Sequence, residues 1–491
     1  MAKILFISDN LVNEGLGIMC LSSYLKRNGH DVQLFLLSEF KGSEGLLRSI
    51  RKTKPDIIGF SVMTPQASQF WTVTKVIKES FNNLKIIWGG PHCMFTPEHV
   101  ITNDAVDIIC TGEGEEALLT LMNRLDANSD FDDIQSLWKK KGREWIKNEV
   151  GRLEENLDKY PFPDRELYFN KYWILRNFGV KRFMTQRGCP FDCSYCFEPS
   201  FKELYKNKGT FIRRHSVEYV MNEIKDIVGR YPANSIHFSD DTFNLNKNWL
   251  EDFLVRYKKE IKLPFTCNVN VLLCDEEMVV KMKDAGCNGV VFGLESGVER
   301  IRMNLLNKKI TDRQYVEAAR LLRKHKLTFV NNIIYGFPNE TLEDTVESVR
   351  FNNSLRPYGI RPCILKIYKG TKLAKFVVAN NLYEAVGEFT YKALDSNNQH
   401  ESIKNMMWAG NVFVKLPFLV PFAKRILSSS ISKFFKPLVL LNHWQDMWFY
   451  KVSLWQSSIY FWHSRKLFMK GLGGTQVDKY RKIQNEACID K

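Results

Sequence analysis

Three cysteines within eight residues form the part of the chain best suited to chemistry. They are Cys189, Cys193 and Cys196, in the run Arg187-Gly188-Cys189-Pro190-Phe191-Asp192-Cys193-Ser194-Tyr195-Cys196. Three thiolates on a tight loop can hold three irons of a cubane cluster, whereas a complete all-protein site uses four. An iron that keeps an open position can bind a further ligand, as open catalytic zinc sites do. The Cys-x3-Cys-x2-Cys spacing, with an aromatic residue before the last cysteine, therefore predicts a [4Fe-4S] cluster.

Zinc is the alternative metal for this triplet. A structural zinc site would need a fourth ligand from elsewhere, and His215 or Cys267 would be the candidates. The chain has eleven cysteines, an odd number that is scattered except for the triplet, so we exclude a disulfide framework. Cys267, Cys274 and Cys287 are widely spaced in apolar settings, which favours buried, inert thiols over a second cluster.

The first 140 residues alternate apolar strands with amphipathic helices, which predicts a doubly wound parallel sheet. The expected strands are Lys3–Ser8, Asp31–Leu37, Asp56–Val62, Lys85–Gly89 and Asp107–Thr111, and the expected helices are Leu16–Asn28, Gly45–Thr53, Gln66–Ser80 and Gly114–Leu125. In such sheets ligands bind beyond the carboxyl ends of the strands. Glycines at those ends, in Gly89-Gly90 and Gly112-Glu113-Gly114, would let the backbone approach a bulky ligand.

A polar connector is expected over residues 141–175, followed by a second α/β region over residues 176–375 that predicts a complete or partial parallel barrel. Its expected strands are Arg182–Thr185, Ser235–Phe238, Phe265–Val269, Gly289–Gly293, Thr328–Tyr335 and Ile364–Ile367, and its expected helices include Val217–Val228 and Asp312–Lys324. Residues 376–491 are expected to be helical. The cysteine triplet follows the first of these strands, at the barrel end where chemistry is usual.

With these motifs in place, residues 1–375 resemble the cobalamin-binding branch of the radical S-adenosylmethionine (SAM) superfamily. The resemblance implies a flavodoxin-like cobalamin domain before a partial barrel. It also implies that the three cysteines bind [4Fe-4S], whose open iron chelates the amino and carboxylate groups of SAM. One electron, from a donor such as flavodoxin or ferredoxin, then cleaves SAM to methionine and a 5′-deoxyadenosyl radical. Tyr195 would lie near the adenine.

Two further motifs carry over from the family residue by residue. Phe238-Ser239-Asp240-Asp241-Thr242-Phe243 corresponds to the strand end that contacts the ammonium group of SAM, so Asp240 or Asp241 is the expected acceptor; a helix N-cap is the alternative. Gly293-Leu294-Glu295-Ser296-Gly297 resembles the motif near the ribose, where Glu295 would accept hydrogen bonds or form a barrel salt bridge. Tyr335-Gly336-Phe337-Pro338 and Tyr368-Lys369-Gly370-Thr371 match later loops, although Lys369 stands where the family usually has Pro.

The resemblance also implies cobalamin contacts in the first domain, with Thr64, Gly89 and Gly90 as candidates. Many cobalamin proteins carry an Asp-x-His-x-x-Gly signature that supplies a lower cobalt ligand, and this chain lacks it. The radical branch often lacks it too. His92 could replace that ligand, but a loop histidine beside a phosphate or amide is the preferred interpretation. A flavodoxin-like unit that binds nothing is the alternative for the whole domain.

The C-terminal region is basic and aromatic. Residues 401–491 contain 14 Lys or Arg against 5 Asp or Glu, which is +9 of the net charge of +15. One helical face gathers aromatic and apolar residues, namely Trp444, Trp448, Trp455, Ile459 and Trp462. Such a face fits core or substrate-pocket packing, or peripheral contact with a membrane surface. The chain has no nucleic-acid-binding motif, no signal peptide and no spanning run, so we expect a cytoplasmic protein, or one peripheral at the inner membrane.

Together these features predict an enzyme that joins both cofactors. It would methylate an unactivated carbon of a hydrophobic or lipid-like small molecule, since polar methyl transfer does not easily reach a carbon without acidity or lone pairs. A cyclase or oxidase that uses cobalamin without methyl transfer is the first alternative. An iron-sulfur or zinc sensor module is the second.

Overall fold

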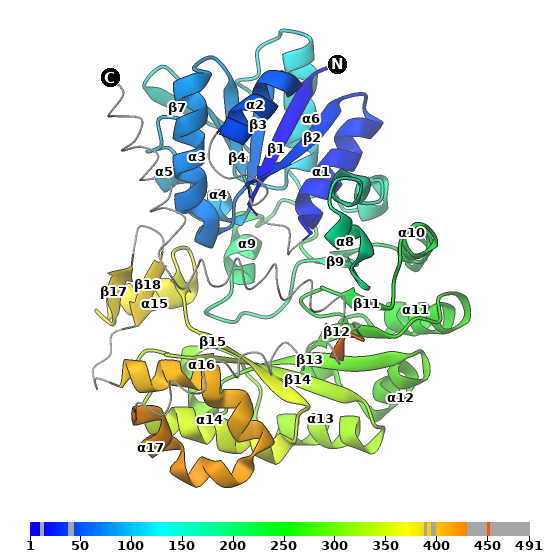
Figure 1. Ribbon diagram of the computed structural model, residues 1–491, viewed down its shortest axis with the longest axis vertical. Helices are drawn as coiled ribbons and strands as arrows, with labels where there is room; N and C mark the ends of the chain where they lie inside the picture. The colour runs from blue at the N-terminus through cyan, green and yellow to red at the C-terminus, as the bar shows by residue number, and fades with distance from the viewer. Residues whose placement is uncertain (10–13, 38–43, 387–389, 394–398, 430–448, 452–491) are drawn as a thin grey trace. The chain divides into compact units, whose positions relative to one another are not determined.

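The computed structural model describes residues 1–9, 14–37, 44–386, 390–393, 399–429 and 449–451. It contains two compact units (Figure 1). Among the described residues, unit 1 comprises Met1–Asn177 and Leu204–Thr210, and unit 2 comprises Phe178–Glu203 and residues 211–451. Each unit is built around one main sheet.

Unit 1 contains a seven-stranded sheet in the order β2-β1-β3-β4-β5-β6-β7. The first five strands are parallel, and the order 2-1-3-4-5 is the flavodoxin-like, doubly wound arrangement expected from the sequence. Their bounds are β1 Lys3–Ser8, β2 Asp31–Leu36, β3 Ile57–Ser61, β4 Lys85–Gly89 and β5 Ile108–Cys110. Each agrees with its expected strand to within one residue at either end. The Ile, Val and Phe side chains of these strands are buried in the core, which is why continuous apolar runs predict the strands.

The helices of unit 1 flank this sheet (Figure 1). They are α1 Leu16–Arg27, α2 Glu44–Thr53, α3 Ala67–Ser80, α4 Pro91–Phe95, α5 Pro97–Val100, α6 Glu115–Asp126, α7 Glu166–Phe169 and α8 Trp173–Asn177, with short 3₁₀ turns at η2 Thr64–Gln66 and η3 Leu157–Lys159. All four helices expected in this part of the chain are present.

The carboxyl-terminal part of unit 1 differs from the expected connector. Strands β6 Leu137–Lys141 and β7 Glu144–Lys147 form an antiparallel hairpin that extends the sheet beyond β5. Four lysines and Glu144 give these strands the polar composition of a loop, so their sequence does not predict a hairpin. Further along, Arg165 is buried and its guanidinium lies 2.5 Å from the Glu14 carboxylate, which ties residues near 165 to the loop that follows β1.

Unit 2 contains six parallel strands in the order β15-β14-β13-β12-β11-β8, which form a half-barrel. Their bounds are β8 Val180–Phe183, β11 Ser235–Phe238, β12 Phe265–Val269, β13 Cys287–Glu295, β14 Thr328–Tyr335 and β15 Gly359–Ile364. The last strand begins five residues before its expected start at Ile364. Gly359, Arg361 and Pro362 resemble loop residues, but a proline is tolerated in a strand at the sheet edge.

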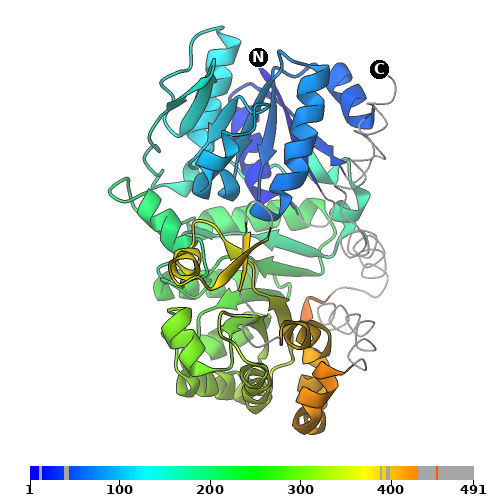
Figure 2. The ribbon, with the colours of Figure 1, turned by 90° about the vertical axis from the view of Figure 1, so that its left-hand side faces the viewer.

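Helices connect these strands and cover their outer side (Figures 1 and 2). They are α10 Val217–Arg230, α11 Lys247–Glu260, α12 Glu276–Asp284, α13 Asp312–Lys324 and α14 Leu342–Leu355, with shorter turns at η4 Val271–Leu273 and η5 Ile301–Leu305. Two further helices, α9 Glu198–Leu204 and α15 Lys372–Ala379, follow the cysteine loop and Thr371. Two small sheets complete the unit, formed by β9 Gln186–Arg187 with β10 Arg213–Arg214, and by β16 Ile367–Tyr368, β18 Thr390–Ala393 and β17 Tyr383–Val386.

The described C-terminal helices cover the open edge of the half-barrel. They are α16 His400–Lys415, the 3₁₀ segment η6 Pro417–Phe422 and α17 Ala423–Ser428. Asn411 of α16 brackets the backbone of Ile360 in β15, accepting from its N–H at 2.8 Å and donating to its carbonyl at 2.7 Å. A side-chain amide thus replaces the missing strand partner and blocks pairing with another chain at this edge.

A short segment of the C-terminal region fills the amino-terminal end of the half-barrel. Phe449 is fully buried against Val291 and Val330, and a Cβ on Gly289 would lie 2.4 Å from its ring. The Asn288 side chain donates to the Phe449 carbonyl at 2.8 Å. This short segment of the C-terminal region therefore serves core packing. The tryptophans and Ile459 of the expected aromatic face lie outside the described residues.

Among the described residues, no helix is both long enough and apolar enough to cross a bilayer.

Candidate active site

All three cysteines of the triplet line one cavity at the carboxyl ends of the half-barrel strands. The cavity has about 890 Å³ of space not filled by protein atoms, part of it open to solvent. Tyr195, Asp241 and Glu295 line the same cavity, so the structure brings together six of the residues singled out from the sequence.

The cysteine loop is held by contacts from several parts of unit 2. Gly188 has a φ of 85°, and a Cβ there would lie 2.6 Å from the Phe211 carbonyl, so only glycine fits the entry to the loop. The Ser194 N–H donates to the Leu306 carbonyl at 2.8 Å, just after η5. The Cys189 N–H donates to the Glu198 carboxylate at 2.8 Å. These contacts position the backbone of the cysteine loop.

The electrostatics of the cavity disfavour free thiolates. Burial raises the pKa of Cys189 and of Cys193, and it raises the pKa of Cys196 to about 12. Burial and then the charge of Asp241 raise the pKa of the Glu198 carboxyl to about 7. A bound metal reverses this situation because its positive charge deprotonates coordinating thiols. Three buried thiols that face one cavity are a donor set that fits a [4Fe-4S] cluster with one iron left open.

Asp240 and Asp241 are neighbours with different surroundings. Asp240 is 1% exposed, and its carboxylate accepts from the Thr185 N–H at 2.7 Å, the Thr185 hydroxyl at 3.0 Å and the Gln186 N–H at 2.7 Å. Burial raises its pKa to about 6 against these hydrogen bonds. Asp241 instead lines the cavity beside the cysteines. Asp240 therefore anchors the segment that leads into the cysteine loop, and of the two aspartates Asp241 alone lines the cavity.

Glu295 enters the cavity through an irregularity in β13. The register with β14 shifts between Gly293 and Glu295, and Glu295 has a φ of 65°, which is uncommon for a residue with a side chain. Its carboxylate lies 3.2 Å from the ammonium of Lys308 and accepts a hydrogen bond from Tyr195. Burial alone would lower the pKa of Lys308, but Tyr315, Glu295 and Cys193 together raise it. Lys308 thus remains a cation inside the cavity.

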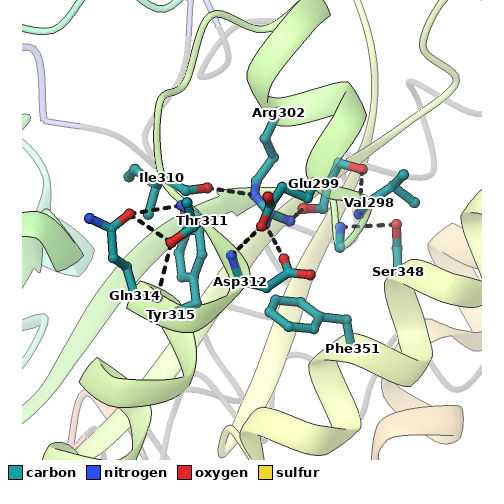
Figure 3. A network of polar contacts seen from close by, with 12 residues as sticks. Val298, Glu299, Arg302, Ile310, Thr311, Asp312, Gln314, Tyr315, Ser348 and Phe351 are labelled. Atoms are coloured by element: carbon teal, nitrogen blue, oxygen red, sulfur yellow. Dashed lines mark hydrogen bonds and ion pairs between the residues drawn. The ribbon is translucent and has the colours of Figure 1, made fainter.

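A buried arginine organises the chain between β13 and α13 (Figure 3). Arg302 is 0% exposed and donates to the Ser296 carbonyl at 2.7 Å and the Ile310 carbonyl at 3.3 Å, while its other terminal nitrogen pairs with Asp312. The Tyr315 hydroxyl in turn donates to the Gly293 carbonyl at 2.8 Å. One guanidinium therefore fixes the strand-end loop that carries Glu295 and the start of the helix that carries Tyr315.

Several cavity residues were not predicted. They are Phe191, Glu198, Thr242, Asn268, Val269, Asn270, Val271, Val291, Gly293, Lys308, Ile310, Tyr315 and Asn332. A signal was present for two of them, because Thr266, Asn268 and Asn270 alternate with apolar residues along and just after β12, and alternate strand residues face the same side. Lys308 follows β13 in a loop with no such regularity.

The carboxyl edge of the unit 1 sheet is built differently. Gly90 has a φ of 89°, and a Cβ there would lie 2.8 Å from the Val62 backbone nitrogen. His92 is fully buried, with its Nδ1 3.3 Å from the Thr64 hydroxyl and 3.2 Å from the Thr96 hydroxyl. Burial and then His99 lower its pKa to about 4, so the ring is neutral near pH 7. This edge offers backbone and glycine to a ligand, while His92 serves as an internal support.

The structure also bears on the zinc alternative for the cysteine triplet. Cys267 is 0% exposed in β12 and pairs with Cys287, and burial raises its pKa well above the usual value. It is absent from the residues that line the cavity. No three His, Cys, Asp or Glu side chains in the described part of the chain are arranged around a single metal ion. Thiols that each bind a different iron need not approach one common point.

Two family models match the chain. One, described as the Radical SAM superfamily, covers residues 183–351. The other, described as a B12 binding domain, covers residues 2–122. The first range includes the three cysteines and the half-barrel, and the second covers the parallel sheet of unit 1.

Curated relatives agree with this division. An uncharacterized methyltransferase, PH0819 of Pyrococcus horikoshii, is 33% identical over 387 residues, which are 77% of this chain and 82% of that protein. An anaerobic magnesium-protoporphyrin IX monomethyl ester cyclase of Cereibacter sphaeroides is 25% identical, over 67% of this chain and 55% of its own. A hopanoid C-3 methylase of Methylococcus capsulatus is 23% identical, over 65% of this chain and 61% of its own.

Solved structures show the same fold. The cobalamin-dependent SAM radical enzyme OxsB, with aqua-cobalamin and SAM bound, superposes with a TM-score of 0.70 at 17% identity, over 90% of this chain and 75% of its own. The radical SAM methyltransferase TsrM of Kitasatospora setae, with cobalamin and a [4Fe-4S] cluster bound, gives a TM-score of 0.63 at 16% identity, over 79% of this chain and 77% of its own. The cofactors of this enzyme class are therefore a [4Fe-4S] cluster, SAM and cobalamin. The chain belongs to the cobalamin-dependent branch of the radical SAM superfamily, the branch that contains methyltransferases.

Proposed function

We propose that this enzyme transfers a methyl group to an unactivated carbon of a hydrophobic or lipid-like small molecule. The observation that carries the proposal is the cavity in which three cysteine thiols face Asp241, Glu295 and Lys308, in a chain that also has a B12 binding domain. When bound, the cluster would supply one electron, SAM would supply the group that abstracts hydrogen, and cobalamin would supply the methyl group.

The residues of the cavity have separate roles in this proposal. Cys189, Cys193 and Cys196 hold three irons, and the Glu198 carboxylate keeps the Cys189 backbone in place. Asp241 accepts from the ammonium group of SAM, and Glu295, fixed by Lys308, accepts from the ribose hydroxyls. Tyr195 belongs to the cysteine loop and donates a hydrogen bond to Glu295 at the cavity wall, where its ring can meet the adenine. Thr64, Gly89 and Gly90 contact cobalamin at the edge of unit 1.

The apolar part of the cavity supports the substrate class. Phe191, Val269, Val271, Val291 and Ile310 line it, so it can bury a hydrocarbon surface beside the polar cofactor groups. The hopanoid methylase shows that a relative of this chain acts on a lipid. We further propose that a reduced flavodoxin or ferredoxin supplies the electron, and that the C-terminal region gives access to a lipid-like substrate through peripheral membrane contact.

A labelling experiment tests the proposal. The anaerobically reconstituted enzyme receives reductant, cobalamin, SAM labelled with CD₃ on its methyl group, and a lipid extract. We expect one CD₃-labelled product molecule for each deoxyadenosine formed. Formation of deoxyadenosine together with an unlabelled product that is cyclised or oxidised would support the cyclase or oxidase alternative. One relative of this chain is a cyclase, the magnesium-protoporphyrin enzyme. Absence of both deoxyadenosine and iron would support a zinc-binding module.

A further inference from the structure

Three large apolar side chains project from the short segment between α16 and α17. Leu416 is 41% exposed, Phe418 is 68% exposed and Phe422 is 59% exposed. Phe418 and Phe422 belong to η6, whose other side buries Val420. Ala423 and Leu427 of α17 are buried as well, so the segment is packed firmly against its own unit. We call Leu416, Phe418 and Phe422 the apolar ridge.

Exposure of this kind is unusual in a folded protein. Single exposed apolar residues are normal, but three within seven positions on one short segment mark a surface that meets something. Pro417 and Pro421 stiffen the segment, because each fixes its own φ. The fold therefore holds the two phenylalanines in their exposed positions. The α16–α17 region that carries them lies at the outside of its unit (Figure 2).

Basic residues flank the ridge in the sequence. Lys415 at the end of α16 is exposed, and so are Lys424 and Arg425 in α17. Lys424 forms an ion pair with Glu343, and the Lys415 ammonium donates to the Tyr358 carbonyl at 2.5 Å. The three basic residues outnumber this one acidic partner, so the surface beside the ridge carries a net positive charge. In the sequence, residues 402–445 contain no Asp or Glu and six Lys or Arg. A surface that combines exposed aromatic side chains with basic residues matches the interfacial zone of a bilayer that contains anionic lipids.

A second copy of the chain, or another protein, is a less suitable partner for the apolar ridge than a bilayer. A stable protein interface buries about 1,200–2,000 Å² and usually has few lysines at its centre. The ridge offers three apolar side chains within seven residues, which is too small for such an interface. Insertion at the lipid–water boundary needs only a few aromatic side chains with basic neighbours.

We propose that the apolar ridge and its basic neighbours dock the C-terminal region onto an anionic lipid bilayer. This inference builds on the proposed lipid-like substrate, but the docking step is independent of catalysis. The phenylalanine rings enter the headgroup boundary, and Lys415, Lys424 and Arg425 lie at the level of the lipid phosphates. No residue of the ridge lines the cysteine cavity.

Vesicle co-sedimentation of the full-length, cofactor-loaded chain tests the proposal. We expect binding to vesicles that contain phosphatidylglycerol, about tenfold weaker binding to pure phosphatidylcholine, and weakening at high salt. The double variant Phe418→Ser/Phe422→Ser should bind anionic vesicles about tenfold less or weaker still. The matched control is Val255→Ser, which removes an apolar side chain that is 70% exposed on α11 and should bind as the wild type does.

Iron content and deoxyadenosine formation in detergent-free buffer show that the ridge variant is folded, since the ridge lies outside the cavity. Equal vesicle binding by the ridge variant and the wild type would overturn the proposal. The proposal would also be overturned if light scattering without lipid showed that the wild type is a dimer and that the ridge variant is a monomer. If labelled methyl transfer fails while vesicle binding behaves as expected, the proposed function is wrong and the docking surface stands.

Discussion

The carboxyl edges of the two parallel sheets make different use of the same architecture. The half-barrel edge presents reactive side chains to a cavity, with three thiols, three carboxylates and an ammonium from Lys308. The edge of the unit 1 sheet presents backbone and glycine, and its histidine, His92, is buried and neutral near pH 7. Parallel sheets place ligands at this edge in both cases. The difference lies in whether side chains or backbone meet the ligand.

That difference explains what each region tolerates. A site made of side chains is lost when one functional group is removed. A site made of backbone is lost when an added atom blocks the approach. The two edges should therefore respond to different kinds of substitution, and each should keep its cofactor when the other is damaged.

The largest expected effect is at the cysteine edge. Cys196→Ala removes one of three iron ligands, so we expect loss of the cluster iron and deoxyadenosine formation at background level, with cobalamin binding unchanged. Iron and sulfide analysis with chromatographic detection of deoxyadenosine gives the measurement. Cys20→Ala, at a half-buried cysteine of α1, is the control and should keep full activity. Normal turnover by the Cys196 variant would contradict the assignment of the cluster.

Gly90→Ala tests the backbone edge. Its φ of 89° and the 2.8 Å approach of a Cβ to the Val62 nitrogen combine strain with a clash against backbone. We expect a loss of about 3 kcal/mol in the free energy of unfolding and weaker hydroxocobalamin binding, with normal cluster content. Gly17→Ala in α1 is the control, because nothing lies within 4 Å of the added Cβ and alanine favours helix. Unchanged cobalamin affinity in the Gly90 variant would show that this loop does not contact cobalamin.

The neutral state of His92 predicts a pH dependence of stability. Its folded pKa of about 4 lies below the ordinary histidine value of about 6.5, so the unfolded chain takes up the proton first as the pH falls. Stability from this group is present above about pH 6.5 and is lost as the pH falls toward 4, by about 2 kcal/mol at about pH 5. His92→Gln should reduce this slope in urea unfolding curves measured by circular dichroism. His237, whose burial lowers its pKa to about 3, should maintain a residual slope. Identical slopes in both proteins would argue against the neutral buried ring.

The smallest expected effect separates the two neighbouring aspartates. Asp241→Asn removes a charge that faces the cavity, so we expect about tenfold weaker SAM binding, or about 1.4 kcal/mol. Asp240→Asn is the matched control, because an amide oxygen can still accept from the Thr185 and Gln186 N–H groups and the amide nitrogen can donate to the Thr185 hydroxyl. Titration of the reconstituted enzyme with SAM measures both. A larger loss of affinity in the Asp240 variant would reverse the assigned roles.

The sequence predicted the elements whose patterns are strong. Every parallel strand of unit 1 was expected, since buried Ile, Val and Phe runs give a clear signal, and the cysteine spacing located the centre of the cavity. The sequence does not predict the β6–β7 hairpin, because the lysines and the single glutamate of these edge strands give them the composition of a loop. β15 was expected too late because Gly359, Arg361 and Pro362 look like a loop.

The cavity residues were harder to predict because their positions depend on the fold. Asp240 and Asp241 look equivalent in the sequence, and only the hydrogen bonds from Thr185 and Gln186 show that Asp240 points into the protein. Lys308 reaches Glu295 from a loop thirteen residues away through the turn that Arg302 organises. No local pattern encodes such a contact, since it arises from packing between α13 and the half-barrel.

Iron analysis of the anaerobically reconstituted wild-type chain, followed by reduction with SAM, tests the central claim most directly. We predict about four irons and four sulfides per chain, and formation of deoxyadenosine once reductant is added. A chain that binds zinc without iron, or one that holds a cluster yet leaves SAM intact after reduction, would contradict the account.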